Sequence, residues 1–470
     1  MTRGRFLAAA ATVAALVCPA GASPASTEAS LETAARLRDE ALAGSGAFDI
    51  VRSLSLEVGP RLAGSAGDRA AVAWAHETLE SLGFDRVWSQ PVTVPHWDRG
   101  TAEGWILDPY PRSVVLAALG GSVGTPAAGI TAEVVAFDSL EALAVASREE
   151  VEGRIVYIGD RMERRRDGAG YRQAVAKRGR GAVAAGKLGA AAVLIRSAGT
   201  STARVAHTGA MRYEEGVARI PAAALSNADA DVLSHLLAAG EPVRFQLRST
   251  ARTLADEESA NVFAEIAGRE RADEIVLLAC HLDSWDLGQG AVDDGAGCAI
   301  VIEALRRLAA LPQPPRRTVR IGLFANEEFG LTGAREYAEQ LGADATSHVL
   351  GMEADLGAGR VWRFDWRLEE SAFDWVDRVA PLLEPLGIER GGNEAFGGAD
   401  LSPLRRAGLP VISLRHDARP YFDVHHTAND TLEQIEIEAL DQGVAAYLVA
   451  AYLAAEYEGE FRWLPPTEPR

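Results

Sequence analysis

The sequence predicts an α/β fold built on a mostly parallel sheet with helices on both faces, interrupted by an inserted domain. The first observation behind this prediction is an alternation of strand-like and helix-like segments from residue 261 to the C-terminus. Such alternation is typical of parallel strands joined by crossover helices. The second is a block of short apolar runs separated by turns, between residues 126 and 252. We therefore expect the inserted domain at 126–252 to divide a larger domain into the segments 23–125 and 253–470.

Length and charge restrict the class of protein. With 470 residues and 48% hydrophobic content, the chain can bury a large core and form more than one domain. Its formal net charge of -19 argues against nucleic acid as a partner, because nucleic-acid binders carry a basic surface.

The N-terminus has the features of a secretory signal peptide. Arg3 and Arg5 precede the apolar run 6–17, and a group of small residues ends at Ala22. We expect cleavage after Ala22, so that residues 1–22 are removed and the mature protein is exported to the periplasm or the extracellular medium. The apolar run is too short to span a bilayer, so we expect no membrane anchor.

Each element is predicted from the spacing of its apolar residues, three or four apart for helices and alternating or unbroken for strands. Before the inserted domain we expect helices at 31–42, 48–58 and 70–82 and a strand at 87–94. A Gly/Pro-rich passage at 120–129 marks the boundary. Within the inserted domain we expect strands at 133–137, 154–158, 191–195, 220–225 and 243–247, and helices at 171–188 and 229–237. Beyond it, strands and helices alternate over 275–280, 293–310, 318–325, 331–341, 348–354, 361–366, 369–386, 410–415 and 433–456.

The strand 275–280 leads into a group of chemically active side chains. Its unbroken apolar run is typical of a strand buried on both faces, and His281 and Asp283 follow at its end. Asp293 and Asp294 come next, directly before a helical pattern. Ligands of open α/β sheets bind beyond the carboxyl ends of the strands. These residues therefore have the placement of half a metal site.

Three further strands also end in acids or histidines. They are 318–325 before Glu327 and Glu328, 348–354 before Asp355, and 411–414 before a loop with His425 and His426. Taken singly, an acid before a helix is usually a cap, and a lone histidine is more often a core residue. Together at one sheet edge, they form the ligand set of zinc. Two metals suit this set better than one, because a bridging Asp with one His and one carboxylate for each ion leaves one acid free.

Cys280 and Cys298 are the two cysteines that remain after the signal peptide is removed. Cys280 closes the buried strand, and Cys298 lies in the first turns of the following helix. We expect buried free thiols rather than a disulfide, because free cysteine often packs as a small apolar residue. Neither belongs to the CxxC spacing of a zinc or redox motif.

A resemblance to a known family rests on four motifs: HLDSWDLGQGAVDDGAG, ANEEFG, MEAD and HHTANDT. They resemble those of the co-catalytic di-zinc exopeptidases, which include bacterial leucyl aminopeptidase and glutamate carboxypeptidase II. The resemblance is strongest toward the plasma glutamate carboxypeptidase (carboxypeptidase Q) branch, and it extends to VGPRLAGS at 58–65, PHWDRG at 95–100 and RIPAAALSNADADVL at 219–233. It implies the zinc exopeptidase fold, two zinc ions, a protease-associated (PA) domain as the insert, and a homodimer.

The resemblance also implies a role for each site residue. The metal ligands would be His281 and Asp355 on one zinc, Glu328 and His426 on the other, and Asp293 as the bridge. Glu327 would be the general base that activates the zinc-bridged water. The family pattern H-x-x-x-D-T selects His426 over His425. Asp283 and Asp430 would support the ligands, Asp283 by fixing the tautomer of His281, and Asp294 would cap the helix.

The expected function is hydrolysis of dipeptides or short peptides by a carboxypeptidase Q-like exopeptidase. The first alternative is a di-zinc aminopeptidase. An aminopeptidase needs an acid for the substrate's ammonium group, whereas a carboxypeptidase or dipeptidase needs a cation or amide donors for the terminal carboxylate. The second alternative is a non-catalytic binding protein on the same fold. The sequence leaves the direction of attack and the side-chain preference open.

Three other motifs were weighed. Residues 120–124 match GxSxG, but Pro126 stands where the helix of a serine hydrolase would begin. His76 begins HETLE, which lacks the second histidine of HExxH. A basic cluster is either a solvated face or an electropositive rim that steers peptides with a free carboxylate. It comprises Arg161 to Arg166 with Lys177, Arg178 and Arg180.

Overall fold

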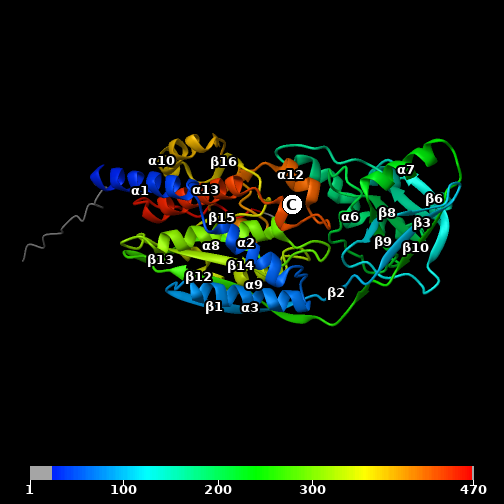
Figure 1. Ribbon diagram of the computed structural model, residues 1–470, viewed down its shortest axis with the longest axis horizontal. Helices are drawn as coiled ribbons and strands as arrows, with labels where there is room; N and C mark the ends of the chain where they lie inside the picture. Colours follow the sequence, from blue (N-terminus) through cyan, green and yellow to red (C-terminus); the bar gives the residue numbers. More distant parts are fainter. Residues whose placement is uncertain (1–23, 468–470) are drawn as a thin grey trace, which may run out of the picture.

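The computed structural model describes residues 24–467, so the predicted signal peptide at 1–22 lies outside the described residues. The molecule is elongated and consists of two units (Figure 1). The main unit comprises residues 24–98 and 252–467, and the insert unit comprises residues 102–249; each contains an eight-stranded sheet. Where the chain passes between the units, β2 (Trp97–Asp98) pairs with β11 (Arg252–Thr253) in an antiparallel ribbon.

The main sheet is parallel at its centre and antiparallel toward its edges, with the strand order β1-β12-β14-β13-β15-β18-β16-β17. Its strands are β1 (Arg86–Val94), β12 (Glu257–Ile266), β13 (Arg271–His281), β14 (Arg317–Phe324), β15 (His348–Glu353), β16 (Val361–Arg367), β17 (Glu389–Arg390) and β18 (Val411–His416). The central strands β14, β13, β15 and β18 run parallel, as predicted. β12 is antiparallel to both of its neighbours and was not predicted, because Glu257 and Glu258 open it in place of an apolar run.

Strand β13 shows why the centre of the sheet is apolar throughout. Val276, Leu278 and Cys280 face one core, and Leu277 and Ala279 face the other. Successive side chains of a strand point to opposite faces, so a strand covered on both sides must be apolar at every position. The unbroken run at 275–280 follows from this burial.

Helices cover both faces of the main sheet, which confirms the predicted layer arrangement. One core includes residues of α1 (Pro24–Leu42), α2 (Ala47–Ser53), α3 (Ala66–Ser81), α8 (Ala296–Ala309), α10 (Phe373–Leu383) and α13 (Ile437–Glu456). The core on the opposite face includes residues of α9 (Thr332–Leu341) and α11 (Ser402–Ala407).

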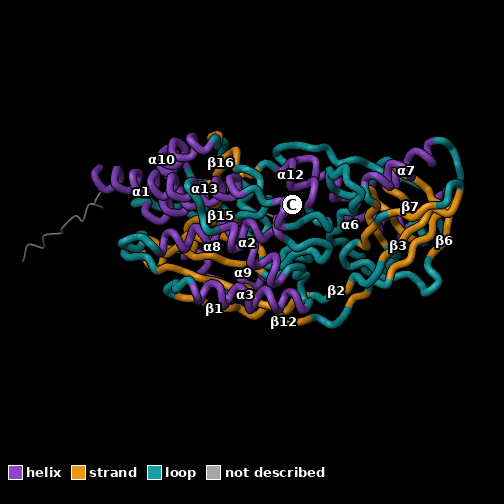
Figure 2. The backbone as a smooth tube through the Cα atoms, in the orientation of Figure 1, coloured by secondary structure: helices purple, strands orange, loops and turns teal. Residues whose placement is uncertain are grey.

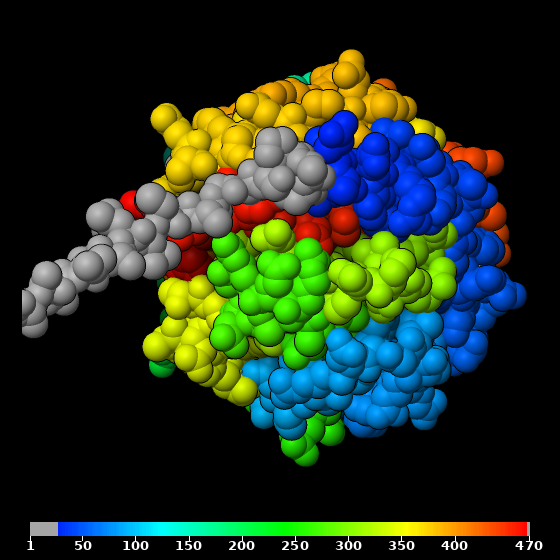
Figure 3. Space-filling view, turned by 90° about the vertical axis from the view of Figure 1, so that its left-hand side faces the viewer, coloured from blue at the N-terminus to red at the C-terminus, as the bar shows by residue number. Residues whose placement is uncertain are grey.

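Helix α13 is the most apolar helix of the larger layer. Its mean hydropathy of 1.2 would suit a membrane span, but 89% of that stretch is buried inside the protein. It packs against α1, α8 and α10. At the end of the molecule away from the insert unit, the blue N-terminal segment and the red C-terminal segment lie side by side (Figure 3). The apolar composition of α13 therefore reflects packing in the core.

The insert unit has the strand order β4-β3-β10-β6-β7-β8-β9-β5. Its strands are β3 (Ala102–Asp108), β4 (Arg112–Val114), β5 (Leu116–Ala118), β6 (Ile130–Phe137), β7 (Ile155–Ile158), β8 (Ala192–Arg196), β9 (Ala222–Leu225) and β10 (Arg244–Ser249). Its helices are α4 (Leu140–Ala144), α5 (Arg148–Val151), α6 (Ala169–Lys187) and α7 (Asn227–Ala238).

This sheet begins upstream of the predicted boundary at residue 126, because β3, β4 and β5 belong to it. The Gly/Pro-rich passage 120–129 is a loop within the unit rather than a linker. The Gly120 amide donates to the carbonyl of Gly209 (3.0 Å), and the Thr125 amide donates to that of Ser249 (2.8 Å). Composition alone could not separate such an internal loop from a domain boundary.

Cys280 and Cys298 form a disulfide, so the prediction of two free thiols was wrong. The end of β13 and the first turns of α8 lie against each other, with the two Cα atoms 5.1 Å apart. That separation is within the range that a disulfide spans. The bond closes the loop that carries His281 and Asp293, and a loop of this length corresponds to roughly 3 kcal/mol of stabilisation.

We expect the mature chain to contain no free thiol. In denaturant without reductant, residues 280 and 298 should resist alkylation, and reduction should expose both to the reagent. Replacing both cysteines by alanine should lower the free energy of unfolding by roughly 3 kcal/mol, because the loop-closure constraint is lost. Mass spectrometry of alkylated peptides checks the first expectation, and denaturant unfolding checks the second. Full alkylation of both cysteines without reductant would contradict the disulfide.

Candidate metal centre

The predicted site residues gather at the carboxyl end of the main sheet, where it faces the insert unit. Figure 2 shows loops, in teal, occupying the region between the two units. Strands β13, β14 and β15 end here, and helix α12 (Ala418–Val424) leads into a fourth loop. The residues that these elements deliver are His281, Asp293, Glu327, Glu328, Asp355 and His426. Segments far apart in the sequence therefore contribute to one site.

Asp293 lies between two groups of side chains. Its Oδ1 is 3.2 Å from His281 Nε2, and Asp355 Oδ1 is 3.6 Å from the same nitrogen. Its Oδ2 is 3.3 Å from His426 Nε2, which is also 2.9 Å from Glu328 Oε2. One carboxylate oxygen thus faces each group, which is the arrangement required of a bridging ligand.

The donor set fits two divalent metal ions of the zinc type. Two groups hold their ligand atoms within 4.8 Å of one another: His281, Asp293 and Asp355, and Asp293, His425 and His426. Imidazole nitrogens and carboxylate oxygens are the ligands that zinc takes in such sites. Glu328 Oε1 is buried and has no hydrogen-bond partner among residues 24–467. A buried oxygen of this kind requires a cation or a hydrogen-bond donor to offset its desolvation.

The electrostatic environment keeps Asp293 ionised. Burial alone would favour the neutral carboxyl, but contacts with His281 and His426 hold the pKa of Asp293 well below its usual range. Asp293 is therefore available as a negatively charged ligand.

Asp430 and Asp294 position the backbone around His281 and Asp293. Asp430 accepts hydrogen bonds from the amides of Val292 (2.6 Å) and Asp293 (3.3 Å), which fits the supporting role predicted for it. Burial and the charge of Asp293 raise the pKa of Asp430 to about 7. Asp294 accepts from the amide of His281 (3.1 Å) and does not cap α8, contrary to the prediction. The reason is that the chain reaches α8 through an irregular turn that directs this carboxylate toward β13.

Asp283 supports the site in a different way from the one predicted. The tautomer of His281 is set by the backbone carbonyl of Asp283, which lies 2.9 Å from Nδ1, and this leaves Nε2 free as a ligand. The carboxylate of Asp283 instead accepts from the amides of Glu327 (2.9 Å) and Glu328 (3.4 Å). It therefore fixes the loop after β14 that presents these two acids.

Sequence reasoning missed two residues that hold the site together. Trp285 donates its indole N–H to Glu328 Oε2 (2.6 Å) and so orients that carboxylate. Arg61 is fully buried and donates to the carbonyls of Leu282 (2.5 Å), Gln289 (2.9 Å) and Gly290 (2.8 Å). The VGPRLAGS motif was a signal for Arg61, but nothing in one sequence pairs it with a loop more than 200 residues away.

Glu327 lies beside the ligands and makes no side-chain hydrogen bond among the described residues. Burial and the charges of Asp355 and Glu328 raise the pKa of Glu327 well above its usual range, against the opposing charge of His281. An uncommitted carboxylate with a raised pKa is suited to proton transfer near neutral pH.

The insert unit fixes the loop that carries His426. The backbone amide of Thr208 donates to the carbonyl of His426 (2.9 Å), and His207 Nδ1 donates to the carbonyl of His425 (2.7 Å). His426 has a φ of 61°, a left-handed conformation that is uncommon outside glycine and needs such support. The His425 ring stacks on that of His426 and lies farther from Asp293, at 3.8 Å.

A cavity of about 460 Å³ opens over the site between the two units. Its lining from the main unit includes Asp293, Glu327, Glu328, Asp355, Tyr421 and His426. Its lining from the insert unit includes Tyr171, Arg178, Met211 and Arg212. A molecule bound in this cavity would therefore contact both units.

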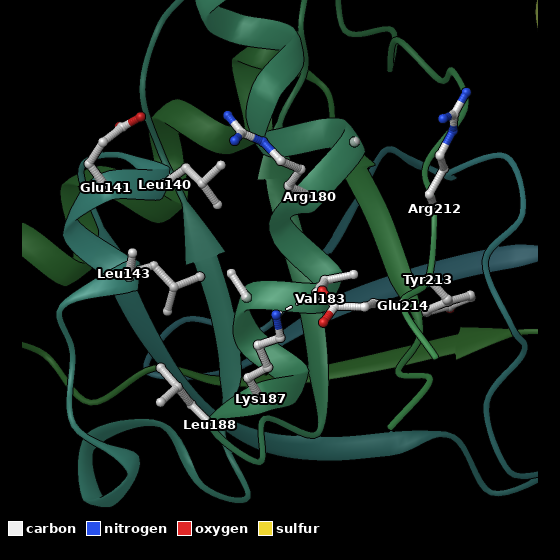
Figure 4. A pocket seen from close by; sticks show the side chains of 13 residues that line it. Leu140, Glu141, Leu143, Arg180, Val183, Lys187, Leu188, Arg212, Tyr213 and Glu214 are labelled. Atoms are coloured by element: carbon white, nitrogen blue, oxygen red, sulfur yellow. Dashed lines mark hydrogen bonds and ion pairs between the residues drawn. The ribbon is translucent and has the colours of Figure 1, made fainter. Parts of the chain in front are cut away.

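A larger cavity, of about 630 Å³, lies within the insert unit between α4 and α6. Figure 4 shows that its labelled lining mixes apolar side chains such as Leu140, Leu143 and Leu188 with charged ones such as Arg180, Lys187 and Glu214. Its lining contains no histidine or cysteine, unlike that of the smaller cavity, which includes His425 and His426. Ser122 of the GxSxG match is 1% exposed and accepts from the amide of Ala222, so it is a structural residue.

Most of the basic cluster is neutralised by ion pairs. The pairs are Arg161–Asp231, Arg164–Asp423, Arg165–Asp167, Arg166–Asp417 and Lys177–Asp160. The expected solvated face is found for the four arginines of these pairs, which are exposed, whereas Lys177 is buried. Arg178 differs, because it lines the cavity over the metal ligands.

Comparisons with known proteins identify relatives of this chain by sequence and by fold. A profile described as peptidase family M28 matches residues 261–451. Carboxypeptidase Q of Mus musculus is 36% identical over 404 residues, which cover 85% of this chain and 84% of the mouse chain. The crystal structure of a peptidase M28 precursor from Shewanella amazonensis superimposes with a TM-score of 0.92 at 48% identity, covering 94% of this chain and 100% of that chain.

A more distant structure shares the fold alone. It is that of BSAP, a zinc aminopeptidase from Bacillus subtilis, with a TM-score of 0.63 at 22% identity, covering 88% of this chain and 95% of that chain. On the relationship to carboxypeptidase Q and the M28 precursor, the chain belongs to peptidase family M28.

Proposed function

We propose that this protein is a di-zinc exopeptidase that hydrolyses dipeptides or short peptides in the manner of carboxypeptidase Q. The observation that carries the proposal is the shared position of Asp293, with one oxygen toward His281 and the other toward His426. This leaves Glu327 beside the ligands with an uncommitted carboxylate. Relatives named carboxypeptidase Q support the choice of substrate class.

His281, Asp355 and Asp293 would hold one zinc ion, and Glu328, His426 and Asp293 the other. When bound, the ions act as Lewis acids that lower the pKa of a water molecule and stabilise charge on the carbonyl oxygen. Glu327 takes a proton from the attacking water and returns it to the leaving amine. The chain's other contribution is positional, because Asp283 fixes the amides of both glutamates and Trp285 orients Glu328.

A di-zinc aminopeptidase is the second candidate. It is favoured by relatives such as aminopeptidase YwaD of Bacillus subtilis, which is 23% identical over 425 residues. A non-catalytic binding module on the same fold is a weaker candidate. A binding module would have no need to keep an acid such as Glu327 free beside intact ligands.

We further propose that the insert unit is a PA domain and that the protein is exported. The predicted signal peptide and the buried Cys280–Cys298 disulfide both support export, since stable disulfides are typical of oxidising compartments.

Replacing Glu327 by glutamine should abolish turnover while the metal is retained. The amide cannot accept the proton, so kcat should fall by about 100- to 10,000-fold. Metal analysis of the purified variant should still give two zinc ions per chain, because Glu327 is not a ligand. Glu339→Gln, on the exposed face of α9, is the matched control and should behave as wild type. Near-normal activity of E327Q would overturn the assignment of the base.

The shared position of Asp293 predicts an asymmetry between two ligand variants. Asp293→Asn should reduce zinc to less than one ion per chain, because both ions lose a ligand. Asp355→Asn should retain about one ion, because only the His281 group is affected. Inductively coupled plasma mass spectrometry after dialysis measures both. A chelator should remove the activity of wild type and zinc should restore it. Equal zinc loss in the two variants would contradict the bridge.

Blocking one terminus of a dipeptide separates the two exopeptidase candidates. We expect hydrolysis of Ala-Leu and a large loss of kcat/KM for Ala-Leu amide, because a dipeptidase or carboxypeptidase recognises the free carboxylate. Chromatographic assay of Ala-Leu, Ala-Leu amide and N-acetyl-Ala-Leu makes the comparison. Hydrolysis of the amide together with failure on the N-acetyl form would establish an aminopeptidase instead.

A further inference from the structure

The larger cavity, on the insert unit between α4 and α6, has no part in the proposed mechanism. Its volume of about 630 Å³ is within the range of ligand sites. Leu140, Leu188 and Tyr213 line it and are only half-buried, although they pack on the edge of an apolar core (Figure 4). Apolar side chains left partly exposed together in one cavity favour a ligand with apolar groups of its own.

The larger cavity adjoins the cavity over the metal ligands along two elements of the insert unit. On α6, Arg178 lines the smaller cavity and the next residue, Gly179, lines the larger one. In the loop between β8 and β9, Met211 lines the smaller cavity, Arg212 lines both, and Tyr213 lines the larger one. The Arg212 amide donates to the Gly179 carbonyl (3.4 Å), so the two elements meet where the cavities adjoin. A peptide that extends from one cavity to the other therefore passes Gly179 and Arg212.

Gly179 leaves space for a ligand at this junction. It lies in the interior of α6, where glycine is less favourable than alanine. A Cβ atom at this position would meet no protein atom within 4 Å, and its φ lies outside the left-handed region. Neither packing nor backbone geometry thus requires a glycine here. The free space beside the helix suits the backbone of a bound peptide.

The lining of the larger cavity also carries uncompensated positive charge. Lys187 is paired with Glu214 (2.7 Å), whereas exposed Arg180 and Arg212 form no ion pair among residues 24–467. Glu141 lies at the same end of the cavity as Arg180 in Figure 4 but forms no ion pair with it. An acidic group on the ligand would complement the two arginines.

We propose that the larger cavity binds the part of a peptide substrate that precedes the cleaved bond, with apolar side chains on its lining and an acidic group at Arg180 and Arg212. The inference rests on the proposed function, because in a carboxypeptidase the preceding residues extend out of the catalytic cavity. From Arg178 to Lys187, α6 rises about 14 Å, which about four extended residues span. Together with the two residues at the metal ligands, this gives a peptide of about six residues. Oligopeptides are then substrates in addition to dipeptides.

Equilibrium binding to the zinc-loaded Glu327→Gln protein tests this site without requiring turnover. Isothermal titration calorimetry should show Glu-Leu-Leu-Gly-Ala-Leu binding at least about tenfold more tightly than Gly-Gly-Gly-Gly-Ala-Leu, because only the first peptide fills the apolar lining. Adding Gly179→Leu should remove this preference, because the new side chain occupies the junction. It should leave the affinity for Ala-Leu unchanged, since the dipeptide stays in the smaller cavity.

Charge at the larger cavity is tested by a second variant. Arg180→Glu should weaken the hexapeptide that begins with glutamate by about tenfold or more, because attraction becomes repulsion. It should have little effect on the same hexapeptide with glutamine in place of that glutamate. Equal effects on the two peptides would overturn the assignment of an acidic group to this end of the cavity.

Gln173→Leu is the matched control for Gly179→Leu, since Gln173 is exposed on the same helix and lines neither cavity. It should leave every affinity unchanged. Gly179→Leu itself should unfold at the same or a higher temperature, because leucine favours the helix more than glycine does. Absence of a preference between the hexapeptides in the parent, or a preference that survives Gly179→Leu, would overturn the inference. Equal weakening of Ala-Leu would also overturn it, because the damage would then lie in the catalytic cavity. Failure of the proposed function is a separate result, in which the binding preference is present but wild type leaves Ala-Leu intact.

Discussion

The site depends on the position of a single carboxylate, that of Asp293. Its two oxygens lie 3.2 Å from His281 Nε2 and 3.3 Å from His426 Nε2, so a small rotation would remove it from one group or the other. Asp430 holds its backbone amide, and Arg61 fixes the preceding loop through three carbonyls. The disulfide then ties the strand before this loop to the helix after it. Much of the buried polar structure at this sheet edge serves to immobilise one side chain.

The insert unit is part of the site rather than a cover over it. Thr208 holds the backbone of His426 in its left-handed conformation, and His207 holds that of His425. Burial lowers the pKa of His207 to about 4, against the raising effect of its hydrogen bond to His425. His207 therefore remains a neutral donor throughout the physiological range. Because the loop with His426 is held from the insert side, the spacing of the two ligand groups depends on how the two units dock.

The sequence predicted those features that depend on local pattern. The strand 275–280 is apolar because it is buried on both faces, and the acids that follow each parallel strand must meet at one edge. Contacts between residues far apart in the sequence leave no such pattern. The hydrogen bonds of Arg61 and the start of the insert sheet upstream of residue 126 were therefore not predicted. The Cys280–Cys298 disulfide was missed for a different reason, because a buried thiol and a buried disulfide occupy the same apolar positions. The orientation of Asp294 depends on an irregular turn, which spacing does not reveal.

Charge balance gives an independent reason to expect metal ions at this site. Asp293, Glu327, Glu328 and Asp355 lie together at a buried edge, and burial acts to raise the pKa of each. Within residues 24–467, no lysine or arginine forms an ion pair with any of them. The N–H groups of buried Arg61 donate to backbone carbonyls. The histidines must be neutral to act as metal ligands. Protonated His281 and His426 favour the ionised form of Asp293, but they lose that charge when they bind a metal, and divalent cations would then supply it in the least space.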